Sequence, residues 1–188
     1  MNVYDFDGTL YAGDSTVSFL FYLFRHYPRT LRRLPEAGAA FFRMKKGQIS
    51  LTAFKETVYR VFSDIPDVPH EVECFWDGKI GRIKKWYRSV SREDDLVISA
   101  SPEFIVRPAC ERIGIRYVIA SRVDPKTGRF DGINCRDEEK IRRLREAFPD
   151  EKIRDFYSDS HADDPLARLA ERAFRVRGEK ISPWQFRT

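Results

Sequence analysis

Short apolar segments alternate with helical stretches near both ends of the chain, and this alternation constrains the fold more than any other feature. The segments that predict strands are residues 1–6, 95–100, 115–120, 153–157 and 173–176. Strands that alternate with helices are typical of a parallel sheet with helices on both faces. We therefore expect an α/β fold with a three-layer α/β/α core.

A long helical segment interrupts this alternation directly after the first strand. Phe, Leu and Trp recur there at helical spacing between basic residues, and prolines divide the segment at positions 28, 35, 66 and 69. The pattern predicts amphipathic helices at residues 15–26, 29–46, 50–63 and 68–90. We expect residues 1–14 and 93–188 to form the core, and residues 15–92 to form a helical cap domain inserted into it.

The rest of the core is expected to contain shorter helices. The pattern predicts them at residues 102–114, 137–147 and 165–172, with a small hairpin at residues 122–132. Ser101 and Pro102 are favoured residue types for the N-cap and the first helical position, so we expect the first of these helices to begin there.

The composition excludes several classes of protein. Hydrophobic residues make up 42% of the chain and charged residues 34%, as in ordinary globular domains. The net charge of +5 favours anionic ligands, but no nucleic-acid-binding motif accompanies it, and we expect no nucleic-acid partner.

The most apolar run, residues 17–24, is too short to span a bilayer. Three widely spaced cysteines without a Cys-x-x-Cys pair favour a cytoplasmic location, and we expect no signal peptide.

Polar side chains follow three of the predicted strands at the point where each strand ends. They are Asp5 and Asp7, the segment 99–101, and Asp159 with Asp163. A lysine, Lys140, begins the helix before the fourth strand. Each group alone has an ordinary explanation as a turn, a helix cap or a solvated side chain. Because the carboxyl ends of parallel strands meet at one edge of a sheet, we expect the groups to lie together.

These segments, in this order, resemble the four motifs of the haloacid dehalogenase-type phosphohydrolase superfamily. They are DFDGTL at 5–10, VISAS at 97–101, the lysine at 140, and DSHAD at 159–163. The helical insertion between the first two motifs resembles that of the phosphoserine-phosphatase-like branch. The resemblance implies a Rossmann-like core with a helical cap.

The resemblance also implies a catalytic role for four residues. Asp5 would attack phosphorus and form an aspartyl-phosphate, and Asp7 would protonate the leaving alkoxide and then deprotonate the attacking water. Ser99 would hold phosphoryl oxygens, and Lys140 would offset the negative charge of Asp5 and the phosphate. An aspartate two positions after the nucleophile favours a phosphatase over a dehalogenase, because a halide leaving group needs no proton.

Further residues of the motifs are expected to bind the phosphate or the substrate. The backbone N–H of Ala100, at a helix start, and the side chain of Ser101 would contact phosphoryl oxygens. Gly8 would let the chain turn past the phosphate, and Thr9 would donate hydrogen bonds in that loop. Asp14 stands where the phosphoserine branch has a glutamate that binds the substrate ammonium.

The acidic residues predict a magnesium site. Two unit charges repel by about 4 kcal/mol at a separation of about 4 Å in an effective dielectric of about 20, so clustered carboxylates need a cation. Oxygen ligands favour Mg²⁺. We expect direct ligation by the carboxylates of Asp5 and Asp159 and by the Asp7 carbonyl, and an outer or water-mediated role for Asp163. The role of Asp164 stays open between this site and a helix cap.

The function expected from these residues is a Mg²⁺-dependent phosphomonoesterase acting on a small phosphate ester. One alternative is a phosphatase of a lipid phosphate head group, similar to phosphatidylglycerophosphate, at a membrane surface. Others are a phosphoacceptor signalling module and a protein that kept the fold only for binding. An aliphatic residue near Val58, with Arg60 two positions away, replaces the cap arginine of the phosphoserine branch and argues against phosphoserine as the substrate. The substrate and the oligomeric state stay open.

Overall fold

The structure is a computed structural model, and it describes residues 1–186. Its centre is a six-stranded sheet with the order β3-β2-β1-β4-β5-β6. The first five of these strands are parallel, and β6 runs antiparallel to β5. The strands are β1 (Val3–Tyr4), β2 (Leu96–Pro102), β3 (Tyr117–Ser121), β4 (Ile153–Ser158), β5 (Ala170–Arg177) and β6 (Lys180–Pro183). The α/β class expected from the sequence is confirmed.

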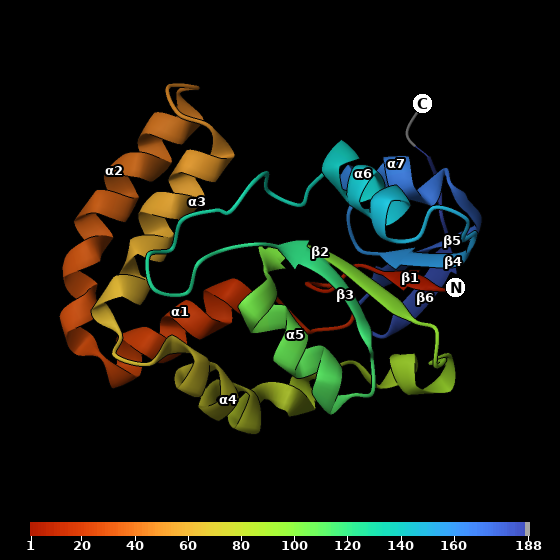
Figure 1. The fold of residues 1–188 in the computed structure, drawn as a ribbon, viewed down its shortest axis with the longest axis horizontal. Coiled ribbons are helices and arrows are strands. Elements are labelled where there is room, and N and C mark those ends of the chain that lie inside the picture. The colour runs from red at the N-terminus through yellow and green to blue at the C-terminus, as the bar shows by residue number, and fades with distance from the viewer. Residues whose placement is uncertain (187–188) are drawn as a thin grey trace.

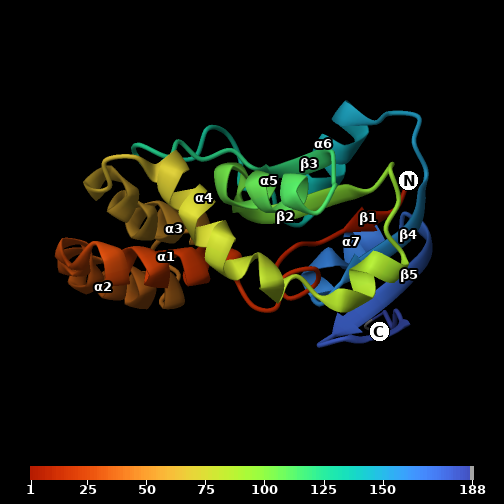
Figure 2. The ribbon, with the colours of Figure 1, turned by 90° about the horizontal axis from the view of Figure 1, so that it is seen from below.

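Helices cover both faces of this sheet (Figures 1 and 2). The core helices are α5 (Glu103–Arg112), α6 (Glu138–Ala147) and α7 (Asp164–Ala167). Neighbouring residues of β1 point to opposite faces, because side chains alternate along a strand. Tyr4 packs in the hydrophobic cluster that contains Ile105 of α5, whereas Val3 packs in the cluster that contains Leu144 of α6.

The segment after β1 is helical, as its amphipathic spacing predicts. Its elements are α1 (Ser15–His26), η1 (Pro28–Arg33), α2 (Leu34–Lys45), α3 (Leu51–Tyr59), η2 (Arg60–Asp64), α4 (Val68–Lys79), η3 (Ile80–Arg82) and η4 (Lys85–Ser89). Side-chain caps start three of the helices: Asp14 caps α1, Ser50 caps α3 and Asp67 caps α4. Figure 1 shows α1, α2 and α3 extending away from the sheet as a separate group.

The expected helix at residues 68–90 is wrong in its second half. Helix α4 ends at Lys79 and gives way to short 3-10 turns. Ile83 instead forms an isolated antiparallel bridge with Tyr11, next to the loop that follows β1. A long-range backbone pairing therefore overrides the local helical pattern.

Two expectations in the core are also corrected. Strand β2 continues through Pro102, and α5 begins at Glu103 without a side-chain cap. Ser101 does not cap this helix: it belongs to β2, and its hydroxyl accepts from Thr16 and donates to the carboxylate of Asp7. The helix expected at 165–172 ends at Ala167, since the following residues enter β5 beside β4. Strand β6 was not expected from the sequence.

The loop after β3 makes close contacts with α3 of the helical segment. The backbone N–H of Phe130 donates to the carboxylate of Glu56 on α3 at 3.0 Å, and the ring of Phe130 stacks on that of Tyr59. Gly128, with φ +72°, lies so close to Tyr59 that an added Cβ would stand 2.3 Å from the Tyr59 carbonyl oxygen. The hairpin expected at 122–132 is present as a single bridge between Val123 and Phe130.

Candidate active site

Lys140 joins two carboxylates at the carboxyl ends of β1 and β4. Its Nζ atom lies 2.8 Å from Oδ1 of Asp5 and 2.7 Å from Oδ1 of Asp163, and only 3% of the residue is exposed. The backbone N–H of Asp5 donates to the carbonyl of Tyr157 at 2.9 Å, which continues the pairing of β1 with β4. The second carboxylate oxygen of Asp163 accepts from the hydroxyl of Ser158 at 2.7 Å. Asp163 is therefore positioned to hold Lys140 in place.

Burial and charge act in opposite directions on this group. Burial raises the pKa of Asp5, and the positive charge of Lys140 offsets part of that rise. For Lys140, burial lowers the pKa, but Asp5 and Asp163 together raise it above its ordinary value. The lysine is therefore a cation that stays charged in the buried site.

Asp7 is held by hydrogen bonds at both carboxylate oxygens. Oδ1 accepts from the backbone N–H of Ser15 at 2.6 Å, and Oδ2 accepts from the hydroxyl of Ser101 at 2.5 Å. The Ser101 hydroxyl accepts in turn from the hydroxyl of Thr16 at 3.0 Å. Burial raises the pKa of Asp7, with a further contribution from the charge of Asp14. A carboxyl whose pKa is raised is suited to give and take a proton near neutral pH.

The loop at Gly8 brings a fourth acidic residue to the same edge. Gly8 has φ +72°, and a Cβ there would stand 2.1 Å from Oδ2 of Asp159. The backbone N–H of Asp159 donates to the hydroxyl of Thr9 at 2.9 Å, so Thr9 accepts rather than donates in this contact. Burial raises the pKa of Asp159, and the charges of Arg175 and Lys84 lower it. Glycine is required here because no side chain fits between the loop and Asp159.

The last residues of β2 contribute their backbone and two serines. Ser99 is buried, and its side-chain oxygen accepts from the backbone N–H of Ser101 at 3.1 Å. The carbonyl of Ala100 accepts from Nζ of Lys55 at 2.9 Å and from the hydroxyl of Ser121 at 3.0 Å. This segment is therefore firmly held at the edge where Asp5 and Asp7 lie.

Two further acidic residues make capping or local contacts. The carboxylate of Asp14 accepts from the backbone N–H of Val17 at 2.8 Å and caps α1. Asp164 accepts from the indole N–H of Trp184 at 2.8 Å and lies 3.2 Å from the ring of His161. Asp14 therefore has a capping role, and the contacts of Asp164 lie within its own loop and with Trp184.

Three residues of the cap segment reach the site without having been expected there. Nζ of Lys84 donates to the carbonyl of Gly8, Lys55 contacts Ala100, and Thr16 contacts Ser101. Lys84 lies within a run of basic residues, which by itself predicts a solvated surface. The sequence carries no signal that separates Lys84 or Lys55 from their basic neighbours.

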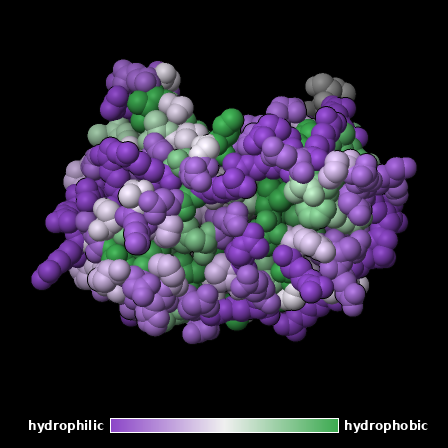
Figure 3. All heavy atoms as spheres, in the orientation of Figure 1, coloured by the Kyte–Doolittle hydropathy of each residue, from purple (hydrophilic) through white to green (hydrophobic). Residues whose placement is uncertain are grey.

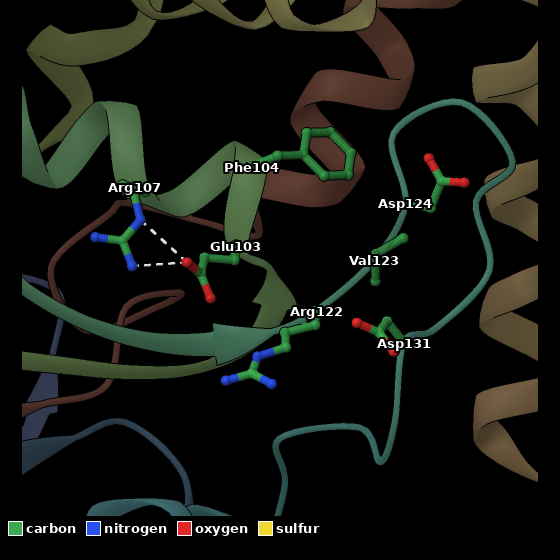
Figure 4. Close-up of a pocket in the computed structure, with 7 residues that line it drawn as sticks. All are labelled: Glu103, Phe104, Arg107, Arg122, Val123, Asp124 and Asp131. Carbon is green, nitrogen blue, oxygen red and sulfur yellow. Dashed lines mark hydrogen bonds and ion pairs between the residues drawn. The ribbon is translucent and has the colours of Figure 1, made fainter. Parts of the chain in front are cut away.

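A cavity of about 430 Å³ lies between the start of α5 and the loop after β3 (Figure 4). Its charged lining groups are of both signs, and Arg107 is already paired with Glu103 at 2.6 Å. None of the aspartates at the strand ends lines it. This cavity is therefore separate from the group of aspartates at the strand edge.

The residues at the edge suit a magnesium ion by their chemistry. Within residues 1–186, no three or more His, Cys, Asp or Glu side chains are grouped so as to hold a metal by themselves. Asp5 and Asp159 nevertheless supply two carboxylates, and the turn at Gly8 brings Asp159 against the backbone of the loop. An oxygen-only set with few protein ligands fits Mg²⁺, which keeps several waters. Raised carboxylate pKa values further favour a cation at this place.

The fold and site define an α/β protein with acidic groups and a buried lysine at the carboxyl edge of a parallel sheet. A family model described as haloacid dehalogenase-like hydrolase matches residues 3–168. The chain belongs to this family, which confirms the resemblance seen in the motifs.

Three known proteins are similar to the chain. Protein CicA of Caulobacter vibrioides (strain NA1000 / CB15N) is 29% identical over 191 residues, which cover 92% of this chain and 84% of CicA. A structure of a protein of unknown function from Bordetella pertussis Tohama I has a TM-score of 0.75 at 20% identity and covers 92% of this chain and 87% of that one. A phospho-aspartyl intermediate analogue of phosphoserine phosphatase has a TM-score of 0.52 at 20% identity, with coverages of 91% and 83%. These structural similarities show a shared fold.

Proposed function

We propose that this protein is a Mg²⁺-dependent phosphomonoesterase that hydrolyses a small phosphate ester through an aspartyl-phosphate on Asp5. The observation that carries the proposal is the contact of Lys140 with both Asp5 and Asp163 at the strand edge. Membership of the hydrolase family supports it. The neighbour with a phospho-aspartyl intermediate analogue, phosphoserine phosphatase, has the same fold and supports the intermediate.

The proposed reaction divides into two steps on this chain's own residues. An oxygen of Asp5 forms a bond to phosphorus while the bond to the leaving oxygen breaks, and the carboxyl of Asp7 gives that oxygen its proton. In the second step Asp7 takes a proton from the water that releases phosphate from Asp5. Lys140 offsets negative charge on Asp5, and the buried Ser99 segment would hold phosphoryl oxygens.

Mg²⁺ would be held by the carboxylates of Asp5 and Asp159 and by the backbone carbonyl of Asp7. When bound, it would neutralise charge on the phosphoryl oxygens. Both carboxylate oxygens of Asp163 already have partners, so we assign Asp163 an indirect role. Residues 15–92 would form the cap domain over the core, which consists of residues 1–14 and 93–188.

The decisive experiment replaces the nucleophile with its neutral isostere. Asp5→Asn should abolish turnover of p-nitrophenyl phosphate in Mg²⁺, because an amide is a far weaker nucleophile than a carboxylate. Asp150→Asn changes an exposed carboxylate in the same way and should leave the rate unchanged. EDTA should stop the reaction and added Mg²⁺ should restore it. Turnover by Asp5→Asn would refute the assignment of Asp5 as the nucleophile. If the unmodified protein instead takes up one phosphate per chain and does not turn over, a phosphoacceptor module would be favoured.

Exposed apolar side chains on the cap favour a second candidate, a phosphatase of a lipid phosphate head group. Phe21 on α1 is 68% exposed and Phe42 on α2 is 66% exposed. The last turn of α2 also carries Arg43 and Lys45. Figure 3 shows hydrophobic residues over the cap among hydrophilic ones. Apolar groups beside cationic ones are typical of surfaces that rest on anionic lipid.

Vesicle binding tests this second candidate. No helix in residues 1–186 combines the length and apolar character needed to cross a membrane, so the proposed contact is peripheral. The protein should sediment with vesicles of phosphatidylglycerol and not with neutral phosphatidylcholine. The double variant Phe21→Ser, Phe42→Ser should bind about tenfold more weakly, whereas Leu169→Ser, an exposed position of the core, should not. Equal binding of all variants would argue against this surface.

A cytoplasmic location is also part of the proposal. Cys74, Cys110 and Cys135 are all free thiols. Free thiols in both buried and partly exposed positions suit a reducing compartment.

A further inference from the structure

A cavity of about 200 Å³ is lined by residues of both α1 and α3. Most of its lining is apolar, and Leu20, Leu51, Phe54 and Val58 supply the side chains. Leu20 is buried, while the other three are partly exposed. Apolar side chains that are partly exposed in such a cavity gain burial when an apolar ligand covers them.

One hydrogen bond joins the lining of the cavity to Asp7, the residue that would protonate the leaving group. Thr16 and Ser101 belong to its lining, and their hydroxyls are hydrogen-bonded to each other at 3.0 Å. Ser101 donates to the carboxylate of Asp7 at 2.5 Å. In the proposed reaction the P–O bond to the leaving group breaks and that oxygen takes the proton of Asp7. The carbon skeleton attached to this oxygen must therefore lie near Asp7, and the cavity begins at Ser101, the hydrogen-bond partner of Asp7.

The charged residues of the lining already have partners within the protein. They are Asp14 and Lys55. Asp14 caps α1 through the N–H of Val17, and Lys55 donates to the carbonyl of Ala100. Burial lowers the pKa of Lys55 to about 8. A leaving group with both an ammonium and a carboxylate, as in an amino-acid phosphate, would place charged groups against the apolar side chains, which is unfavourable.

We infer that the cavity binds the leaving group of the substrate and that the preferred substrates are phosphate monoesters of an apolar alcohol. This inference rests on the proposed function. A cavity of about 150 Å³ holds a benzene molecule, so this one has room for an aryl ring or an alkyl chain of about six carbons. The apolar alcohol could be water-soluble or could belong to a membrane lipid, and the experiment separates these sources.

A series of alkyl phosphates measures the apolar contribution directly. With Mg²⁺ present, kcat/KM should rise about two- to fourfold for each methylene from methyl to hexyl phosphate and then level off when the cavity is full. O-phosphoserine and glycerol phosphate should be poorer substrates than hexyl phosphate. Phosphatidic acid in phosphatidylcholine vesicles tests the lipid source, and turnover of either hexyl phosphate or phosphatidic acid above methyl phosphate supports the inference.

A variant that fills the cavity tests whether the dependence of kcat/KM on chain length arises there. Val58→Phe should lower the ratio of kcat/KM between hexyl and methyl phosphate at least tenfold. Leu31→Phe makes the matched change at an exposed cap residue outside the lining and should keep the ratio of the unmodified protein. A ratio that Val58→Phe leaves unchanged would overturn the assignment of this cavity.

Binding supplies a readout that does not depend on turnover. Alkyl phosphonates cannot be hydrolysed, and calorimetry on the Asp5→Asn protein should show affinity that increases with chain length up to hexyl. If neither kcat/KM nor affinity depends on alkyl chain length, the inference of an apolar leaving group is refuted, while the phosphatase proposal stays intact. Loss of all hydrolysis together with chain-length-dependent binding would instead refute the proposed function alone.

Discussion

The ammonium group of Lys140 lies 2.8 Å from the carboxylate of Asp5, although 135 positions separate the two residues in the chain. Asp5 follows the central strand β1, and Lys140 lies in the first turns of α6, before the neighbouring strand β4. Because Asp163 contacts the same ammonium group, the lysine compensates two buried negative charges at once. Its loss should therefore affect both stability and activity.

Replacing Lys140 by methionine tests this dual role. The variant leaves Asp5 and Asp163 buried without their common cation, which should lower the free energy of unfolding by about 3 kcal/mol. Phosphatase activity should fall at least about 100-fold, because charge at the reacting group is no longer offset. Urea unfolding and p-nitrophenyl phosphate turnover measure the two effects. Lys152→Met, at an exposed lysine, should change neither, and full stability of Lys140→Met would contradict the argument.

The turn at Gly8 should tolerate no side chain. In Gly8→Ala the new Cβ would stand 2.1 Å from Oδ2 of Asp159, so the carboxylate must move away from the loop. We expect at least about a 100-fold loss of activity, of the size seen when a group of the active site is displaced by about 1 Å. Gly47→Ala is the matched control, because Gly47 has a similar φ of +70° and no atom within 4 Å. Equal activity of the two variants would show that the Asp159 contact is not needed.

The contact of Gly128 with Tyr59 should hold the cap against the core. A Cβ in Gly128→Ala would stand 2.3 Å from the Tyr59 carbonyl oxygen, and the substitution should destabilise the protein by about 1–3 kcal/mol. Hydrogen exchange should increase in α3 and η2, whose contacts with the 122–132 loop are loosened. Gly47→Ala again supplies the control, since it has the backbone strain without the clash. Unchanged exchange in α3 would mean that this loop does not restrain the cap.

Acid should weaken one ion-pair cluster of the cap. Hydrogen bonds from Arg33 and Arg32 to Asp64, with N–O distances of 2.8 to 3.0 Å, lower the pKa of Asp64 to about 2. The folded pKa is below the unfolded value of about 3.9, so this stabilisation is fully present above pH 4 and is lost as the pH falls toward 2. Because Arg32 is largely exposed, solvent screening reduces the contribution to about 1 kcal/mol.

Unfolding by urea at pH 6 and at pH 2.5 checks the Asp64 prediction. Asp64→Asn should lose about 1 kcal/mol at pH 6 and much less at pH 2.5, where the carboxylate of the unmodified protein is largely protonated in the unfolded chain. Asp77→Asn is a suitable comparison, because Asp77 is a 74% exposed partner of Arg112. A loss that is the same at both pH values would contradict the lowered pKa.

The sequence predicted well those elements whose pattern is local. Four elements lie within a few residues of their expected positions: the strands before Asp5 and Asp159, and helices α1 and α6. Their signals, the spacing of apolar side chains and the capping residues, are contained in the local sequence. Helix α4 and the segment after Ala167 were wrong in extent for the opposite reason. Backbone pairing of Ile83 with Tyr11, and of β5 with β4, depends on distant partners that no local pattern contains.

The sequence by itself determined the α/β class and the family, because the spacing of polar residues after apolar strands can be read directly from the sequence. It also named Asp5, Asp7, Lys140 and Asp163 as residues that parallel strands would bring to one edge. Only the tertiary structure decided that Lys55, Lys84 and Thr16 reach that edge and that an apolar cavity lies beside Ser101, the hydrogen-bond partner of Asp7. These features depend on how the cap packs on the core, and packing sums many weak contacts between residues that are far apart in sequence.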